Sequence, residues 1–489
     1  MNELHANTPL LVGVGTIHQD APAGQGDDAI GLMTAAARGT GIDCGVPRIL
    51  GRVERILVTQ GSWAAPDAGR SIARAIGASK ARSVFVQLGI PQQAPIDQAL
   101  TAIASGEIDV ALVVGGEAKG RDDRARRAGI TLGPPDDPGT QPDEVQRPLA
   151  EFVAGPELAM GFVVPVQQYA TIDNALRAAE GRTIAEQAAE IDELWSRFDA
   201  VAATNIHAAF AGSRTPEQLR TVTADNRMLA FPYNKWHATQ WSVDQAGALL
   251  LCSERVADEF GIERERRVHP LVSLDSSHSV SLSRRVDLSG WPAMRVLGQA
   301  AATHLGQRLD ELDLVELYSC FPAAVRVQQR ELALRLDGTP TLTGGMPFAG
   351  GPLNNFVFQA TTAMVHRLRA APGDRGLVTS VSGLLTKPGL AVWSTEAGER
   401  PPLLADLASA AAAESPERSV VDGYNGSAVV AAYTVRVSTS GEPEVVTILD
   451  TPEGVRAVAV IPDPDVAVAA QTSEFIGTQV TVAGTQAAV

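Results

Sequence analysis

The chain has 489 residues, about three times the length of a typical domain, which favours two to four domains or one large duplicated fold. Its 45% hydrophobic and 20% charged residues are ordinary for a protein with a full core, and they exclude disordered, collagen-like and coiled-coil chains. The net charge of -16 disfavours nucleic acid and anionic membranes as partners, because both carry negative charge.

Targeting and redox signals are absent from the sequence. No apolar run approaches the roughly 18 residues that a membrane helix needs, and no basic patch with an apolar stretch opens the chain. Cys44, Cys252 and Cys320 stand far apart without a CxxC pair, which argues against a disulfide framework and a metal site. We therefore expect a cytoplasmic protein with no membrane span and no metal.

Residues 1–117 alternate short apolar runs with helical stretches, which is typical of βαβ units and a mostly parallel sheet. The expected strands are 10–14, 54–59, 83–88 and 109–114, and the expected helices are 28–38, 66–76 and 91–104.

From residue 118 to 241 the pattern changes to charge clusters, a Pro/Gly/Asp tract at 133–148, and helical stretches such as 184–201. Insertions this long inside a compact fold usually cover or shape a site. We therefore expect a loop domain over 118–241.

The alternation resumes at 242–399, so two similar halves flank the insertion and indicate an internal duplication. The expected strands are 246–252, 268–274, 312–317, 376–381 and 390–394, and the expected helices are 292–305, 322–336 and 355–370.

The end of the chain forms a separate unit. Residues 400–419 are rich in Pro and Ala and predict a linker or connecting helix. Residues 420–489 are β-patterned and divided by the turn sequences SGEP, TPEG and PDPD, which predicts a small β barrel or sandwich, similar to an oligonucleotide-binding (OB) barrel. This unit holds eight acidic and two basic residues, so nucleic acid is a poor ligand even for an OB-like barrel.

Five segments, in order, resemble the thiolase superfamily. They are PQQAPIDQALTAIASGEIDVALVVGGE (91–117), SVDQAGALLLCSE (242–254), DLVELYSCFPAAV (313–325), TGGMPFAGGPLNN (343–355) and SVSGLLTKPGLAVWS (380–394). The resemblance implies a duplicated α/β thiolase fold of five layers (αβαβα) with a loop domain, followed here by the C-terminal β domain.

The departures from the thiolase pattern concern the catalytic residues. Thiolases use a Cys nucleophile, a second Cys as base, and a His with an Asn or His that hold the oxyanion. The matching positions here are Gly89 for the nucleophile, Tyr318 for the Asn or His, Gly351 for the loop His, and Val381, one residue before Ser382, for the second Cys. Thiolysis and Claisen condensation are therefore not expected.

Within the superfamily the chain is similar to thiolase-like proteins that carry the name acetyl-CoA acetyltransferase although they lack the catalytic cysteine. This resemblance implies a pocket at the C-terminal ends of the central strands, with coenzyme A or an acyl-CoA as ligand under the loop domain and no further cofactor.

Tyr318 is the main candidate for chemistry. By resemblance, a tyrosine at this motif serves the superfamily's retro-aldol enzymes of sterol side-chain breakdown, where a phenol could act as general acid or base. Those enzymes work with a small β-barrel partner, and this chain carries a β domain of its own. The alternative is a buried tyrosine whose hydroxyl satisfies a backbone group.

The glycine-rich loop offers a second set of candidates. Backbone N–H groups of Gly344, Gly345, Gly350 and Gly351 could hold a thioester carbonyl or a phosphate, or the loop is a plain tight turn. The neighbouring residues Asn354 and Asn355 either donate amide hydrogens to the pocket or cap the next helix.

The remaining candidates are weaker. Cys320 lacks a cationic neighbour in the sequence, so structural burial is favoured over a nucleophile. His237 and His278 could reach the cleft, although each fits an ordinary loop residue. The tract 119–127, KGRDDRARR, suits the phosphates of CoA or an exposed, self-compensated helix.

Two functions stay open at this point. One is a protein that handles CoA thioesters, with Tyr-assisted retro-aldol or other thioester chemistry. The other is a catalytically silent acyl-CoA binder or scaffold whose β domain recruits a protein partner. Thiolases usually dimerise through the strand resembling 83–88, but the changed turn at Gly89 and the added domain leave monomer and homodimer both open.

Overall fold

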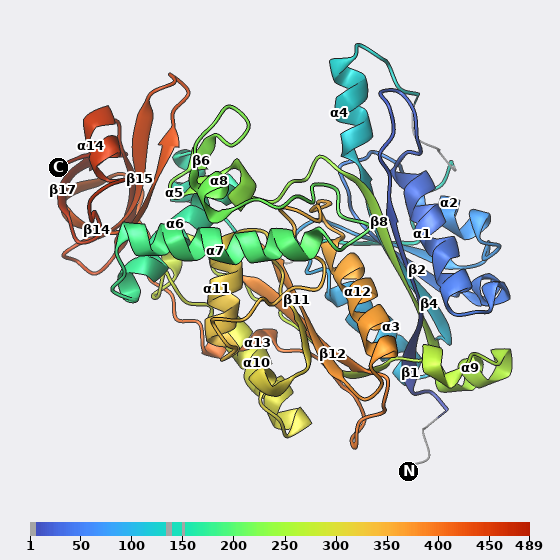
Figure 1. The fold of residues 1–489 in the computed structure, drawn as a ribbon. Helices are drawn as coiled ribbons and strands as arrows, with labels where there is room; N and C mark the ends of the chain where they lie inside the picture. Colours follow the sequence, from blue (N-terminus) through green and yellow to red (C-terminus); the bar gives the residue numbers. More distant parts are fainter. Residues whose placement is uncertain (1–5, 134–138, 149–151) are drawn as a thin grey trace.

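The computed structural model describes residues 6–133, 139–148 and 152–489 (Figure 1). Part of the expected tract at 133–148, namely 134–138, lies outside the described residues. The helices are α1 (Ala29–Asp43), α2 (Ala68–Ala75), α3 (Ala94–Ala104), α4 (Lys119–Arg127), α5 (Gly155–Ala159), α6 (Pro165–Ala179), α7 (Ile184–Ala202), α8 (Pro216–Arg220), α9 (Glu254–Phe260), α10 (Pro292–Leu305), α11 (Pro322–Glu331), α12 (Phe356–Ala370), α13 (Ala408–Ala413) and α14 (Pro464–Ala469).

The strands build two open sheets, a short hairpin and a barrel. They are β1 (Pro9–His18), β2 (Arg55–Thr59), β3 (Arg82–Val86), β4 (Val110–Ala118), β5 (Glu144–Gln146), β6 (Met228–Ala230), β7 (Tyr233–Asn234), β8 (Asp244–Ser253), β9 (His269–Asp275), β10 (Leu314–Glu316), β11 (Arg375–Ser382), β12 (Lys387–Ser394), β13 (Leu403–Asp406), β14 (Tyr424–Val437), β15 (Pro443–Asp450), β16 (Arg456–Ile461), β17 (Gln479–Gly484) and β18 (Gln486–Ala488).

The two open sheets repeat one topology. The first has the order β1-β8-β4-β2-β3-β5, in which β8 runs antiparallel to its neighbours β1 and β4. The second has the order β10-β11-β12-β9-β13, in which β12 runs antiparallel to β9 and β11. The run β1-β8-β4-β2 therefore corresponds to β9-β12-β11-β10, as an internal duplication requires.

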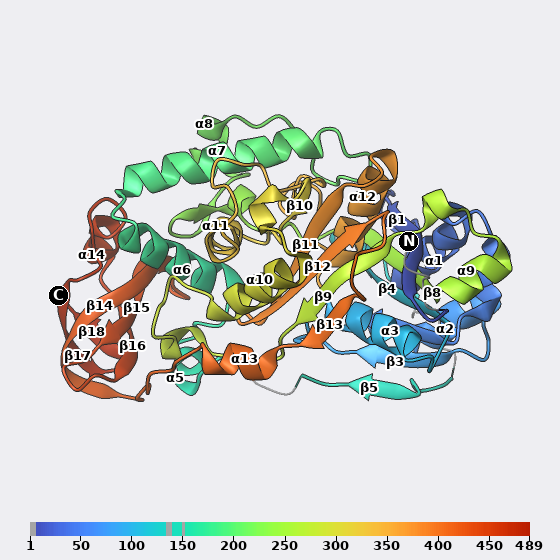
Figure 2. The ribbon, with the colours of Figure 1, turned by 90° about the horizontal axis from the view of Figure 1, so that it is seen from below.

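Helices and sheets stack in five layers (Figure 2). Helices α1, α2 and α9 cover the outer face of the first sheet, and α3 and α12 lie between the two sheets. Helix α10, with α11 beside it, covers the outer face of the second sheet. This is the five-layered α/β thiolase fold that the resemblance to thiolases implies.

Glycines in β1 explain how closely α1 packs on the first sheet. A Cβ placed on Gly13 would lie 2.2 Å from the carbonyl oxygen of Thr40, and one on Gly15 would lie 2.2 Å from that of Ala36. Any larger residue at either position would push α1 away from the strand.

Three strands lie outside the segments that the sequence pattern assigned to their sheets. β8 comes after the expected boundary at residue 242 but completes the first sheet, between β1 and β4. β5 lies in the expected loop domain and extends the first sheet beside β3. β13 lies in the expected linker and extends the second sheet beside β9.

The C-terminal unit is a closed barrel of β14, β15, β16, β18 and β17, at the opposite end of the molecule from α9 (Figure 1). It includes α14 and β18, which the sequence pattern did not indicate. The guanidinium of Arg436 donates to the carbonyl oxygens of Met160 and Gly161, at 2.9 and 3.1 Å. Arg177, on α6, forms an ion pair with Glu474, so the barrel is fixed to the loop domain.

Within the described residues, no helix is both long and apolar enough to cross a membrane. Nor do three or more His, Cys, Asp or Glu side chains in that part of the chain come together in a way that could hold a metal ion.

Candidate functional site

Tyr318 lies between β10 and α11, in the interior of the molecule. Its backbone N–H donates to Thr379 Oγ1 at 2.9 Å, and its carbonyl oxygen accepts from Gln328 Nε2 at 2.8 Å. Its hydroxyl oxygen accepts from Gln92 Nε2 at 3.5 Å, and its ring meets the ring of Phe356 edge-on at 5.9 Å. Burial, and then the nearby Cys320, raise the pKa of Tyr318 far above its ordinary value, so the phenol is neutral at physiological pH.

Two polar residues that the sequence analysis did not single out organise the surroundings of Tyr318. Gln92 also accepts the N–H of Val357 at 2.9 Å and thereby ties the turn before α3 to the first turn of α12. Lys387, which is almost fully buried, donates from Nζ to the carbonyl oxygen of Gly89 at 3.0 Å, and burial lowers its pKa. Both lie inside segments that resemble thiolases, and this position is the sequence signal that could have identified them.

Three of the four positions matched to thiolase catalytic residues come together here. Gly89 has φ +98°, and its carbonyl oxygen contacts Lys387. Lys387 lies on β12 opposite Ser382 on β11, and the next pair along these strands is Val381 opposite Pro388. Tyr318 is linked to the same turn through Gln92.

The fourth position, Gly351, packs against another part of the protein. A Cβ on Gly351 would lie 2.2 Å from Thr239 Cγ2, and the N–H of Gly351 donates to the carbonyl oxygen of Gln240 at 2.9 Å. The loop that carries histidine in thiolases thus packs here directly on the loop domain.

The glycine-rich loop directs several of its N–H groups into the protein. Gly344 N–H donates to Thr341 Oγ1 at 2.9 Å, and Gly345 N–H donates to Thr343 Oγ1 at 3.1 Å. A Cβ on Gly350, which has φ +102°, would lie 2.5 Å from Gln245 Oε1. These contacts agree with the tight-turn alternative for Gly344 and Gly345.

A buried carboxyl group anchors the same loop. Glu316, at the end of β10, accepts hydrogen bonds from the N–H and the hydroxyl of Thr343, at 3.0 and 2.9 Å. Burial raises the pKa of Glu316 to about 7 in spite of these donors.

Aromatic rings fill the space around Tyr318 and the glycine-rich loop. Phe321 stacks between Tyr169 and Tyr233, with ring centroids 4.6 and 5.9 Å apart, and Phe348 stacks on Trp236 at 6.5 Å. Phe321 and Phe348 are both buried. The region is therefore packed like a protein core.

The remaining predicted residues fall into different places. Cys320 is buried, and this burial raises the pKa of its thiol to about 12, so the thiol stays protonated. His237 does not reach a cleft: it is buried, its Nε2 contacts Asp192 Oδ1 at 2.9 Å, and its Nδ1 accepts from the N–H of Asn234 at 3.1 Å. His278 lines a separate cavity of about 230 Å³.

The two asparagines lie beside the glycine-rich loop. Asn355 occupies the N-cap position of α12, but its side chain makes no capping bond and instead donates to the carbonyl oxygen of Gln245 at 3.3 Å. Asn354 Nδ2 is buried without a hydrogen-bond partner among the described residues.

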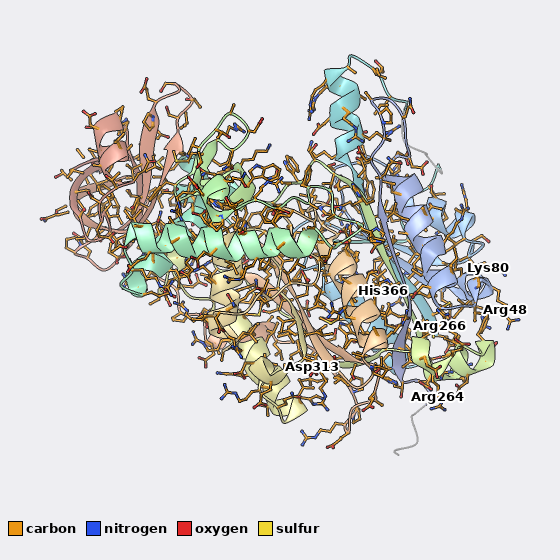
Figure 3. The ribbon with its side chains drawn as sticks, viewed as in Figure 1. Arg48, Lys80, Arg264, Arg266, Asp313 and His366 are labelled. Atoms are coloured by element: carbon orange, nitrogen blue, oxygen red, sulfur yellow. The ribbon has the colours of Figure 1, made fainter. Side chains whose placement is uncertain are left out.

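The basic tract forms α4, and its charges are compensated. Arg124 pairs with Asp244, and Arg126 pairs with Asp123 at 2.6 Å. Other basic side chains lie around α9 and the outer helices, opposite the barrel (Figure 3); the labelled ones are Arg48, Lys80, Arg264 and Arg266. The geometry favours the self-compensated helix over a phosphate site for α4.

Comparison with known proteins agrees with this geometry. A family model described as "Thiolase-like protein type 1 additional C-terminal domain" matches residues 407–486. No protein with a curated description matches the chain.

Three solved structures share the fold. A monomeric SCP2-thiolase-like protein type 1 from Mycobacterium smegmatis has 27% identity and a TM-score of 0.84, with 99% of this chain and 100% of that chain covered. The Ltp2-ChsH2(DUF35) aldolase has 18% identity and a TM-score of 0.60, over 80% of this chain and 98% of that one. Human mitochondrial 3-ketoacyl-CoA thiolase has 16% identity and a TM-score of 0.58, over 80% of this chain and 100% of that one. The repeated sheets, the closed barrel and these similarities together place the chain in the SCP2-thiolase-like superfamily, with an added C-terminal domain.

Proposed function

We propose that this protein binds a coenzyme A thioester without carrying out thiolysis or Claisen condensation. The proposal rests on the residues that occupy the positions of the thiolase catalytic groups. Gly89, Gly351 and Val381 supply neither a thiol nor an imidazole there. Acyl transfer through a covalent intermediate needs an ionised nucleophile and a base in contact with it.

The surroundings of these positions support binding without turnover. Tyr318, Phe321 and Phe348 occupy the interior where the chemistry would take place, and the N–H groups of Gly344, Gly345 and Gly351 already donate to protein oxygens. An oxyanion hole requires donors that point at the developing charge and are free to bind it.

The choice of ligand rests on the fold. The human structure that shares the fold is a 3-ketoacyl-CoA thiolase, which supports a CoA thioester as the ligand class here. The protein from M. smegmatis is described as monomeric, which supports a monomer for this chain as well.

The test is isothermal titration of the full chain with CoA and with acetoacetyl-CoA, followed by mass spectrometry of the recovered ligand. We expect saturable binding of acetoacetyl-CoA that is recovered intact. Ligand at 100 times its Kd should stabilise the fold by about 2.7 kcal/mol, which a melting shift checks independently. Recovery of acetyl-CoA, or no binding at millimolar ligand, would contradict the proposal.

One observation favours a second function, cleavage of a carbon–carbon bond with help from Tyr318. Gln92 donates to the hydroxyl oxygen of Tyr318, which leaves the proton of the neutral phenol available for donation, and the fold is shared with an aldolase. A β-hydroxyacyl-CoA split by the wild type and by Tyr169→Phe, but left intact by Tyr318→Phe, would establish this function in place of the first.

A further inference from the structure

A cavity of about 230 Å³ lies behind the β11–β12 turn. Its walls come from the loop after β9, the loop before α10, the turn itself, and the residues that follow α13. Trp291 Nε1 donates to the carbonyl oxygen of Thr386 at 3.2 Å and so fixes the indole against the turn. The volume is below the roughly 300–1,000 Å³ of pockets for drug-sized ligands, so the cavity suits a small molecule.

Arg285 lines this cavity with a guanidinium group that is only partly satisfied. It is 7% exposed, and its Nε donates to the carbonyl oxygen of Val280 at 3.3 Å, while Nη2 donates to that of Leu384 at 2.5 Å. Its Nη1 is buried with no hydrogen-bond partner among the described residues.

Arg285 makes no ion pair within the described chain, although two carboxylates influence it from a distance. Burial lowers its pKa to about 10, against the opposing influence of Glu157 and Asp287. The oxygens of Glu157 are already used, because they accept the N–H groups of Ser283 and Ala154 at 2.7 and 3.0 Å. A buried cation without an ion-pair partner is costly, so an anion bound in the cavity would stabilise Arg285.

His278 lines the same cavity and also has an unused nitrogen. Its Nε2 is buried and has no partner in the part of the chain that the structure describes. Burial lowers the pKa of His278, against the influence of Glu417, so the ring is neutral near pH 7. A neutral imidazole can place its N–H on either nitrogen, and Nε2 can therefore donate.

Among the other residues that line the cavity, the apolar side chains are buried and the acidic ones are exposed. Val280, Trp291 and Leu385 form buried apolar walls. The acidic residues Asp287 and Glu414 are exposed and lie at the solvent side, and Arg295 pairs with Glu331 at 2.8 Å. The buried part of the cavity thus combines cationic and hydrogen-bonding groups with a hydrocarbon surface.

We propose that this cavity binds a small carboxylic acid with an apolar body. The carboxylate accepts hydrogen bonds from Arg285 and His278, and the hydrocarbon part packs on Trp291 and Leu385. An inorganic phosphate would satisfy the same cation but would leave the apolar walls uncovered. The site needs no thioester, so it goes beyond the function proposed above and can be tested independently of CoA.

The first experiment is calorimetric titration of the full wild-type chain with hexanoate, hexanamide and inorganic phosphate. Hexanamide keeps the size of hexanoate but removes its charge, and phosphate keeps charge without an apolar body. We expect hexanoate to bind at least tenfold more tightly than either. Equal or tighter binding of hexanamide or phosphate would overturn the proposal, as would no hexanoate binding at 10 mM, which would mean that the cavity holds only water.

Variants locate the site. Arg285→Met should weaken hexanoate binding at least tenfold, whereas Arg284→Met should leave it unchanged, because that side chain is half exposed, pairs with Glu417, and lies outside the cavity. His278→Leu keeps Arg285 and should weaken binding several-fold, so it serves if Arg285→Met does not fold. Unchanged affinity in the cavity variants that fold would overturn the proposal.

Discussion

At the scale of single residues, two buried acids, Asp97 and Asp275, contact each other where α3 meets the second sheet. Asp97 Oδ1 accepts from Gln93 Nε2 at 2.8 Å and contacts the hydroxyl of Ser273. Burial, and then the charge of Asp275, raise the pKa of Asp97 well above its ordinary value. Asp406, on β13, lies directly opposite Asp275, on β9. Burial and the charge of Asp406 raise the pKa of Asp275 to about 7.

This pair predicts that stability falls as the pH rises from about 4 to about 7. The native pKa of Asp275 lies above its ordinary value of 3.8, so the folded state holds a proton that the unfolded state has lost in this window. Asp275→Asn should therefore match the wild type near pH 4 and be more stable above pH 7. Urea denaturation across this range measures the difference.

The control for this prediction is Asp225→Asn, which removes an exposed carboxylate and should leave the pH profile unchanged. The groove beside the pair is also lined by the charged residues Arg55, Arg82, Glu107 and Glu144. Parallel profiles for Asp275→Asn and the wild type would contradict the assignment.

At the scale of elements, the short strand β5 determines which sheet edge is available to another molecule. It pairs in parallel with β3, from Val84 opposite Glu144 to Val86 opposite Gln146. Polar contacts hold it, because Asp143 pairs with Arg70 at 2.6 Å and accepts the N–H of Ser83 at 2.8 Å. The strand that resembles the thiolase dimer contact is therefore covered by the same chain.

We expect a monomer in solution, measured by light scattering coupled to size exclusion. The carbonyl oxygen of Gln146 accepts the N–H of Gln87 at 3.0 Å, so the backbone of Gln146 faces β3. Gln146→Pro should therefore disrupt β5, expose the edge of β3, and cause self-association that grows with protein concentration, because an unpaired strand edge readily accepts another strand. Gln146→Ala keeps the backbone hydrogen bonds and should remain monomeric. A wild-type dimer would show that this edge does not decide the oligomeric state.

Elements with strong local signals could be predicted from the sequence, and those made by distant contacts could not. Helix α10 has its predicted bounds because Pro292 favours its first turn and Gly306, with φ +62°, ends it. β5 has no alternation of apolar residues from which it could be predicted, because ion pairs and its pairing with β3 stabilise it. β13 lies in a segment rich in Ala and Pro, which does not indicate a strand. Its partner strand, β9, is far away in the chain.

The candidate site shows the same division. The positions of Gly89, Tyr318 and Ser382 in one region followed from resemblance. The roles of Gln92 and Lys387 did not, because their partners are 226 and 298 residues away in the chain. His237 was a candidate for the cleft, but the buried Asp192 that holds it comes from α7 and carries no sequence signal.

At the scale of the whole molecule, the barrel supports the cavity that Arg285 and His278 line. Arg456, on β16, is buried, and its guanidinium donates to the carbonyl oxygens of Ser283, Arg285 and Val286, at 3.4 Å for Ser283 and 3.2 Å for Val286. Asp450 accepts from its Nε at 2.8 Å. The added domain therefore fixes the backbone of the loop that carries Arg285.

Arg456→Met should weaken hexanoate binding several-fold, although Arg456 does not line the cavity. The loop around Arg285 would lose its donors, and each carbonyl left buried without a partner costs about 1–3 kcal/mol. Urea denaturation should show the loss of stability, and calorimetric titration of the folded variant should show the loss of affinity. Arg418→Met is the matched control, because Arg418 pairs with the same Asp450 at 2.9 Å but is partly exposed and holds none of these three carbonyls. If both variants bound hexanoate like the wild type, the barrel would be joined to the core without influence on the cavity.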